Sequence, residues 1–501
     1  MSDSMGRSAL ALVLAISGAL VVPGPAHAAP TDHTWGGGSY APASDLDSGN
    51  WAWDGSPTYW TGDNVPDNPS SINGENAIIN DTSGDRNITT PDPLQVHKVT
   101  INQSAGSAGV NKLTLGGDML INLATSGLTL SNGTGSPANL VIDLNGHTLT
   151  TKNAILMNNF TLQTSQVGGE LTANTPNFGS GAVIGADVTV HQTVQSTFVP
   201  NGTWDATSTL VLTPVAAPTN RASLIFNNAL IGNLVVGEDG SSTAYLFDFN
   251  AGFAFSTQGD VTIHSPAGST AQNLVFKSSG TLAAATLAVR GDFVDHGAAN
   301  AANYGNPGSL TGTLAFFGDP GTPSTVSIAR QLENNFRVGD KGTDPGGLPG
   351  NAPSNGNVLL DQDLTTTGSF LVRDGSALDL ADHVLRSGDL TLESGSSLSY
   401  TLGSDLGLIE VGGSVSVGGL LFLDTSGLSM DLNSIVLIDN DGTDAISGTF
   451  ANAPPGTLFS TPSGTYRLVY DFRGNDLALV PEPAALGLLG LGGLLVLRRR
   501  T

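Results

Sequence analysis

The sequence predicts an all-β protein whose body is a parallel β-solenoid, a coil of short strands stacked along one axis. Three observations predict this fold: segments in which apolar and polar residues alternate, turns rich in Gly, Asn and Ser between them, and a repeat of about 20 residues. Strands this short must stack to bury enough apolar surface. A Greek-key sandwich, or a string of sandwiches, is the alternative because the spacing of the turns is irregular.

The composition changes along the 501 residues and divides the chain into seven parts. These are an N-terminal leader (1–28), a Trp/Gly-rich N-terminal cap (29–99), a β-repeat region (100–336), a Gly/Pro-rich loop or seam (337–357), a second β-repeat region (358–433), a C-terminal β cap (434–479) and a C-terminal tail (480–501) with an apolar segment at 484–497.

The leader has the three parts of a secretory signal peptide. Arg7 precedes an apolar stretch from Ala9 to Val22, which is followed by Ala-His-Ala. We therefore expect a signal helix that is removed by cleavage after Ala28, and a body that is exported. An uncleaved N-terminal anchor is the alternative.

The first part of the exported body carries four of the five tryptophans, including Trp51, Trp53 and Trp60. Aromatic rings stack on sugar rings, so these three side chains are candidate carbohydrate contacts. The alternative is that they cover the open end of a β structure, because the terminal repeats of a solenoid must differ from the inner ones. This Trp- and Gly-rich opening resembles the start of autotransporter-like β-repeat proteins of bacterial surfaces.

The repeat is clearest where residues 368–380 (GSFLVRDGSALDL) align with residues 388–400 (GDLTLESGSSLSY). The offset is 20 residues, and both Gly positions, a Ser and the apolar pattern match. The heads GDVTI, GDFVD and GSVSV, which begin at Gly259, Gly291 and Gly413, repeat the start of this unit at looser spacing. Such a unit favours a parallel solenoid.

The sequence of residues 434–479 predicts strands with clear turns between them. Their order LIDNDG, SGTF, YRLVY, GND resembles the closing segment of bacterial autotransporter-type and anchored surface repeat proteins, which implies a β cap. Asp439, Asp441 and Asp444 are weak calcium candidates, since three carboxylates and a Gly turn fall within six positions. Phe450 stands where an EF-hand loop needs Glu, so an ordinary Asx-turn without a cofactor is the favoured interpretation.

Charge and motif content argue against nucleic-acid binding and catalysis. The chain has 43 acidic and 18 basic residues, and without its two terminal segments its net charge is −27, the opposite of what phosphate binding needs. It has no Cys, none of its eight His residues lies three or four positions from another, and it has no nucleotide-binding or Ser-hydrolase motif. We predict no enzyme, no catalytic or cofactor-binding residues and no nucleic-acid partner.

The chain ends in VPEPAALGLLGLGGLLVLRRRT, from Val480 to Thr501. The uncharged segment Ala484 to Leu497 would span about 21 Å as a helix, which is short of a hydrocarbon core of about 30 Å. The following Arg498, Arg499 and Arg500 are a stop-transfer and positive-inside signal. We therefore expect a short transmembrane helix at 484–497; a buried core helix is the alternative.

Pro481, Glu482 and Pro483, the short apolar segment and the Arg cluster together resemble the PEP-CTERM sorting signal of Gram-negative and related bacteria. The resemblance implies an exosortase as partner, a membrane cysteine protease that cleaves near the Pro-Glu-Pro. It implies anchoring in the membrane first and a place at the cell surface or outside it afterwards. It also implies an association with exopolysaccharide, which bacteria with this signal produce.

These observations predict an exported surface or extracellular-matrix protein with a structural or adhesive role. A carbohydrate-binding or polysaccharide-degrading β-helix protein is the alternative function.

Overall fold

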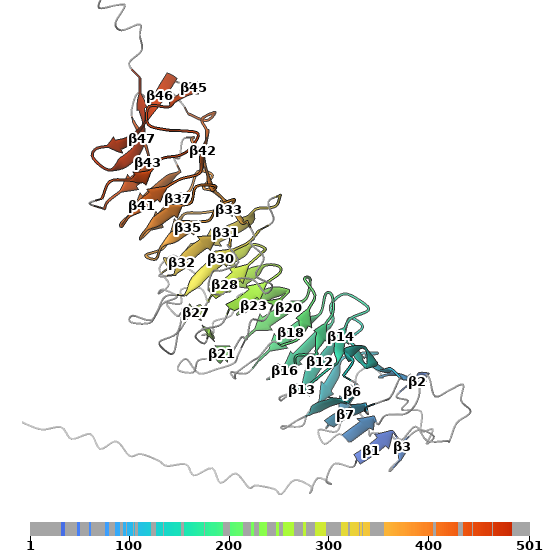
Figure 1. Cartoon of the computed structure of the whole chain (residues 1–501). Helices are drawn as coiled ribbons and strands as arrows, with labels where there is room; N and C mark the ends of the chain where they lie inside the picture. The colour runs from blue at the N-terminus through green and yellow to red at the C-terminus, as the bar shows by residue number, and fades with distance from the viewer. Residues whose placement is uncertain are drawn as a thin grey trace, which may run out of the picture.

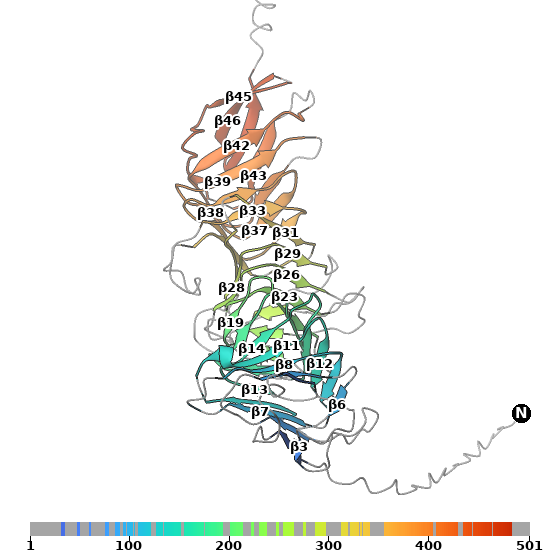
Figure 2. The same ribbon diagram turned by 90° about the vertical axis from the view of Figure 1, so that its right-hand side faces the viewer.

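A computed structural model of the chain describes residues between 32 and 482, with longer gaps at 36–47, 51–59, 62–75, 194–200, 214–221, 238–246, 265–273, 277–285, 297–311 and 341–354 and shorter gaps elsewhere. The expected signal helix, Ala28 and the expected transmembrane helix at 484–497 lie outside the described residues. Within them the fold is all-β, with one 3-10 turn (Pro137–Asn139) and no α-helix. The strands form an elongated stack with β1 near one end and β45 near the other (Figures 1 and 2).

Each coil of the stack contributes up to three strands, one to each of three faces, which we number in the order in which the chain visits them. In one coil these strands are β7 (Lys98–Gln103), β8 (Asn111–Thr114) and β9 (Met119–Ile121). Each pairs in parallel with the corresponding strand of the next coil. The parallel, β-solenoid-like stacking that the sequence predicts is thus confirmed.

Face 3 is continuous along the stack. In the described chain it is one 14-stranded parallel sheet. Its strands are β6 (Leu94–Val96), β9, β12 (Thr148–Thr151), β15 (Glu170–Ala173), β18 (Thr189–Gln192), β20 (Thr209–Leu212), β23 (Asn233–Val236), β26 (Val261–Ile263), β29 (Phe293–Asp295), β31 (Ser324–Ile328), β33 (Asn357–Leu360), β36 (Ala377–Asp379), β39 (Ser397–Thr401) and β42 (Leu420–Asp424).

Face 2 consists of two parallel sheets, and β22 contacts β19 where the second sheet begins. The first sheet contains β2 (Ser48–Asn50), β5 (Arg86–Thr89), β8, β11 (Leu140–Asp143), β14 (Thr161–Gln163), β17 (Val183–Ile184) and β19 (Thr203–Trp204). The second contains β22 (Leu230–Ile231), β25 (Ala254–Thr257), β28 (Thr286–Val289), β30 (Thr313–Phe316), β32 (Asn335–Val338), β35 (Phe370–Val372), β38 (Leu390–Leu392), β41 (Val415–Val417) and β44 (Ser447–Gly448).

Face 1 consists of three sheets in the described chain, and its first and last sheets include antiparallel strands. The first contains β3 (Trp60–Thr61), β1 (Asp32–Trp35), β4 (Asn76–Ile79), β7, β10 (Leu128–Asn132), β13 (Ile155–Met157) and β16 (Pro176–Phe178). The second contains β21 (Ala222–Leu224), β24 (Phe247–Phe249) and β27 (Leu274–Phe276). The third contains β34 (Leu364–Thr365), β37 (Val384–Ser387), β40 (Leu408–Val411), β43 (Ile435–Asn440), β47 (Asp476–Pro481), β46 (Gly464–Phe472) and β45 (Leu458–Thr461).

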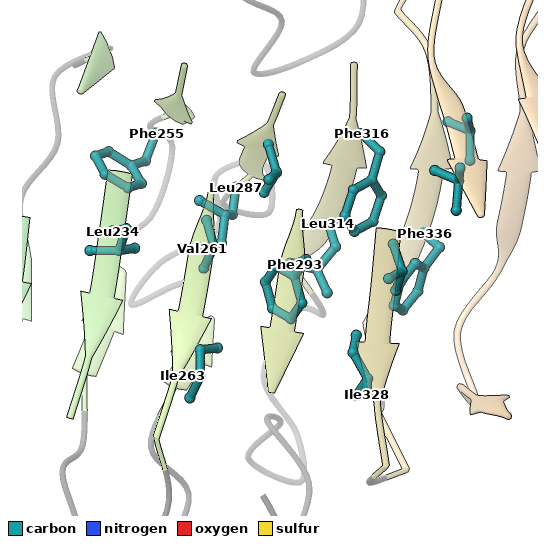
Figure 3. Close-up of a cluster of buried hydrophobic side chains, with 14 of the residues drawn as sticks. Leu234, Phe255, Val261, Ile263, Leu287, Phe293, Leu314, Phe316, Ile328 and Phe336 are labelled. Atoms are coloured by element: carbon teal, nitrogen blue, oxygen red, sulfur yellow. The ribbon is translucent and has the colours of Figure 1, made fainter. Parts of the chain in front are cut away.

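The core is a set of columns that run along the inside of the stack. Alternate residues of a strand point inward, which is why β7 shows strict alternation of buried and half-buried positions. One column on face 2 consists of paired, fully buried residues of five successive coils: Phe255, Leu287, Leu314, Phe336 and Phe370. Figure 3 shows part of this column, and the rings of Phe336 and Phe370 stack with centroids 5.5 Å apart.

The 20-residue repeat corresponds to one coil. Phe370 pairs with Leu390 on face 2 and Ala377 with Ser397 on face 3, in the register that the sequence alignment predicts. On either side of the Gly/Pro-rich 337–357, β31 pairs with β33 and β32 pairs with β35, so both ladders continue across this stretch. Its first residues, Arg337 and Val338, belong to β32 itself.

The Gly-Asp heads form corners that bond one coil to the next. Between faces 2 and 3, Asp260 Oδ1 accepts the Asp292 N–H at 2.8 Å, and Asp292 Oδ1 accepts the Thr325 N–H at 2.7 Å. The glycine before each Asp lets the coils approach, since a Cβ on Gly291 would lie 2.2 Å from Asp260 Oδ1. Gly368 and Gly388, in contrast, lead into the face-2 strands β35 and β38. The prediction that the heads at Gly259 and Gly291 repeat the start of that unit is therefore wrong, whereas Gly413, which leads into β41 of face 2, does repeat it.

At its C-terminal end the stack changes from parallel to antiparallel pairing. Strands β43, β47, β46 and β45 form an antiparallel extension of face 1, which we call the C-terminal cap. The amide of Asn452 bonds both the N–H and the carbonyl of Leu421, at 2.9 and 2.8 Å, and so occupies backbone groups of β42, the last strand of face 3. An edge treated in this way is protected from pairing with another chain.

Candidate functional site

The C-terminal cap continues into the Pro-Glu-Pro of the tail. Strand β47 ends at Pro481, which pairs with Tyr466 of β46. Beyond it, Glu482 donates its N–H to the carbonyl of Thr465 at 2.9 Å, and its Oε1 lies 3.1 Å from Arg467 Nε. The sheet thus extends past residue 479, where the sequence places the end of the cap. Pro483 and the arginines Arg498, Arg499 and Arg500 lie outside the described residues.

A shallow groove of about 480 Å³ lies next to the cap, at the corner between faces 1 and 2. Strands β37 and β40 supply Arg386 and Glu410, and the turns that lead from them into β38 and β41 supply Asp389 and the glycines of the floor. Asp441 follows β43. It is lined by Thr366, Thr367, Arg386, Ser387, Gly388, Asp389, Glu410, Val411, Gly412, Gly413 and Asp441. We call it the corner groove.

Arg386 is held between two carboxylates of neighbouring coils. Its Nε lies 2.7 Å from Glu410 Oε2 and its Nη2 lies 3.3 Å from Glu410 Oε1, while Nη1 lies 3.7 Å from Asp363 Oδ2. Arg386 and Glu410 are direct partners in the ladder between β37 and β40, so the pair forms as soon as the two coils stack. Because Arg386 is 41% exposed, water screens this pair and its contribution to stability is small.

The floor of the groove is bare backbone because the corner needs glycine. A Cβ on Gly413 would lie 2.6 Å from the carbonyl oxygen of Gly388 in the previous coil. Beside it, Asp389 Oδ1 accepts the N–H of Ser414 at 2.7 Å and its hydroxyl at 2.8 Å. Asp389 and Glu410 are therefore already engaged in bonds between coils.

The calcium candidates lie at the edge of this groove. Asp441 lines it, and Asp439 is the ladder partner of Glu410. Burial raises the pKa of Asp439, and the negative charges of Asp476, Asp441 and Glu410 raise it further. The backbone carbonyl of Asp444 accepts a hydrogen bond from Asn440 Nδ2 at 2.6 Å, which ties Asp444 to the same turn.

The turn after Asp439 has the geometry of an Asx-turn. The side chain of Asn440 accepts the N–H of Gly442 at 3.2 Å, in the two-residue spacing of that turn. Across the described part of the chain, no group of three or more His, Asp or Glu residues is placed to hold a metal ion. Calcium binding by Asp439, Asp441 and Asp444 thus stays a prediction.

The tryptophan candidates cannot be placed as a group. Trp51 and Trp53 lie outside the described residues, and for Trp60 the structure describes only its strand, in which it pairs with Trp35 of β1.

The sequence analysis did not identify Arg386, Asp389 and Glu410 as members of one site. A signal was present, since "LRSG" and "IEVGG" both stand just before a Gly corner and so take equivalent places in successive coils.

The chain therefore has the architecture of a three-faced, capped parallel β-solenoid with a polar groove near its C-terminal end. No model of a known protein family, no curated protein and no solved structure matches the chain. In the part of the chain that the structure describes, no helix has the length and apolarity that a membrane crossing requires.

Proposed function

We propose that the protein is an exported scaffold of the cell surface or extracellular matrix, sorted by its C-terminal tail and structural or adhesive in role. The observation that carries this proposal is the direct passage of the last cap strand, β47, into the Pro-Glu-Pro at Pro481 to Pro483. A sorting signal at this place leaves the whole solenoid on one side of the cut. The N-terminal leader, with its cleavage after Ala28, supplies export.

Three further features support a scaffold. The coils stack in one continuous ladder on face 3, which makes a long, stiff body from short strands. The net charge of −27 without the terminal segments keeps such a body hydrated, and its carboxylates are suited to bridging through divalent cations. The C-terminal cap and Asn452 cover strand edges that would otherwise pair with other chains.

The sorting step is tested by cell fractionation in the native host. We expect the wild-type chain to pass through the membrane fraction at full size and then to reach the surface or the medium at the size of a marker chain that stops at Pro483. Replacing Arg498, Arg499 and Arg500 with Ser is expected to reduce the membrane-bound precursor, because the stop-transfer charge is gone. Unchanged size and location of the wild-type chain at all times would refute processing at the tail.

The structural or adhesive role is tested separately with a strain that lacks the protein. We expect this strain to retain less exopolysaccharide on its cells, and to recover it when the full chain is restored but not when a chain without 434–482 is supplied. Equal retention with and without the protein would contradict the role.

Carbohydrate binding is the second candidate function, and the corner groove favours it. Its hydroxyls, its glycine floor and the polar pair Arg386–Glu410 are of the kind that hydrogen-bonds to sugars. We expect the Arg386→Ala variant to bind the host exopolysaccharide more weakly in affinity electrophoresis. Arg473→Ala is the matched control, because Arg473 directly follows β46 and does not line the groove. A Trp51→Ala/Trp53→Ala variant tests the tryptophans in the same assay. We propose no catalytic role, because the sequence holds no nucleotide-binding or Ser-hydrolase motif.

A further inference from the structure

Strand β47 becomes less buried and pairs with fewer neighbouring strands toward the tail. Leu477, Ala478 and Leu479 are fully buried, and Leu479 pairs with Ile435 of β43 on one side and with Leu468 of β46 on the other. Extracting this part of the strand would open the core of the cap. A protease cannot reach peptide bonds here without unfolding the end of the solenoid.

The next three residues are held on one side. Pairing with β43 ends at Leu479 in the described sheet, whereas pairing with β46 continues through Val480 with Arg467 and Pro481 with Tyr466. Glu482 adds the last bonds, from its N–H to Thr465 and from its carboxylate to Arg467. This pair is partly exposed, with Arg467 at 53% and Glu482 at 35%, so it opens far more readily than the buried strand.

We propose, on the basis of the sorting function above, that the cap defines the processing site of the tail: the bond that is cut lies on the C-terminal side of Glu482, and Arg467 is the positioning residue that holds this limit. Proteases bind the residues around the scissile bond in extended form, and residues up to Glu482 are already bonded to β46. In the cut, the C–N bond breaks, the carbonyl carbon gains the oxygen of water, and the released amine takes a proton.

The mature C terminus, measured by mass spectrometry on protein from the native host, tests this proposal. We expect the mature chain to end at Glu482 or at a later residue. A mature chain that ends at Pro481, at Val480 or earlier overturns the inference and leaves the sorting function intact. A chain that keeps its complete tail overturns the sorting function, and the inference falls with it.

Variants of Arg467 test the positioning role. We expect Arg467→Ala to raise the rate of processing roughly two- to five-fold, the range for loss of an exposed ion pair, and to yield some chains that end before Glu482. Arg467→Lys keeps the charge and should restore most of the wild-type rate. Arg473→Ala is the matched control, because Arg473 also belongs to the cap region but lies over the Phe472 ring, 5.2 Å from its centroid.

Hydrogen exchange of the purified variants tests whether the cap is folded in each of them. With a folded cap, a rate and C terminus in Arg467→Ala equal to those of wild type would overturn the role of Arg467. An equal rise in Arg467→Ala and Arg473→Ala would overturn it as well, because general loosening of the cap would then be the cause.

Discussion

The Tyr400 hydroxyl is predicted to hold the C-terminal cap on the solenoid. Tyr400 lies on β39 of face 3, is 1% exposed, and donates a hydrogen bond of 3.0 Å to the carbonyl of Leu437 in β43. Leu437 is the extra residue of a bulge, because Val436 pairs with Ala478 and Ile438 with Leu477. Burial raises the pKa of Tyr400 well above its ordinary value, so the hydroxyl remains a donor at every physiological pH.

Tyr400→Phe removes this donor and keeps the ring. We expect a cost of about 1–2 kcal/mol, because a buried carbonyl loses its partner. Coils contact only their neighbours, so the loss is local. Amides of β43 and β47 should exchange with solvent roughly 5–30-fold faster than in wild type, whereas amides of β11 should be unchanged.

Hydrogen exchange followed by mass spectrometry measures both regions in one experiment. Tyr400→Leu, which removes ring and hydroxyl together, serves as the comparison and should accelerate exchange further. Wild-type exchange at β43 and β47 in Tyr400→Phe, or equal acceleration at β11, would refute the reasoning.

Three more changes give checkable outcomes. Phe336→Ala removes the ring that stacks on Phe370 in the face-2 column and on Phe316 of β30, and we expect the free energy of unfolding in urea to fall by about 3–5 kcal/mol; a fall below about 1 kcal/mol, on the order of a surface substitution, would contradict the packing. For Asp143, burial raises the pKa, but bonds from Lys112, Gln163 and Ser165 outweigh it and hold the pKa below its ordinary value. Its stabilisation is therefore present above the unfolded pKa of about 3.9 and is lost as pH falls through the folded one. Asp143→Asn should be less stable than wild type at neutral pH, and the gap should narrow in acid; a gap independent of pH speaks against the role of the charge. Asp439 has a raised pKa, so its charged form destabilises the fold at neutral pH. The free energy of unfolding of Asp439→Asn should be slightly higher there, by less than about 1 kcal/mol, and the gain should vanish in acid below the unfolded pKa; a lower free energy of unfolding than that of wild type at neutral pH would count against this account.

The all-β class and the repeat could be predicted because both depend on local patterns. Alternation within "KLTL" and the match between the units at Gly368 and Gly388 reflect which side chains face inward and where the chain must turn. The Gly-Asp heads were recognisable as turns for the same reason, but neither the corner of the coil at which each lies nor the bonds that they make between coils could be recognised.

The corner groove could not be predicted, because the coils differ in length. The spacing between face-2 partners is 20 residues from Phe370 to Leu390 and 25 from Leu390 to Val415. With a variable period, sequence offset does not tell which residues meet. Arg386 and Glu410 are neighbours only because β37 and β40 pair in one particular register.

The sequence by itself determined the class of fold and the corners that need Gly, and it predicts a signal peptide at one end and a sorting signal at the other. Each of these depends on residues close together in the chain. Only the tertiary structure decided which coils exchange bonds, where the corner groove lies and that Glu482 is bonded to Arg467. Those contacts join residues of different strands, and the register of stacked backbones, not the local pattern, brings them together.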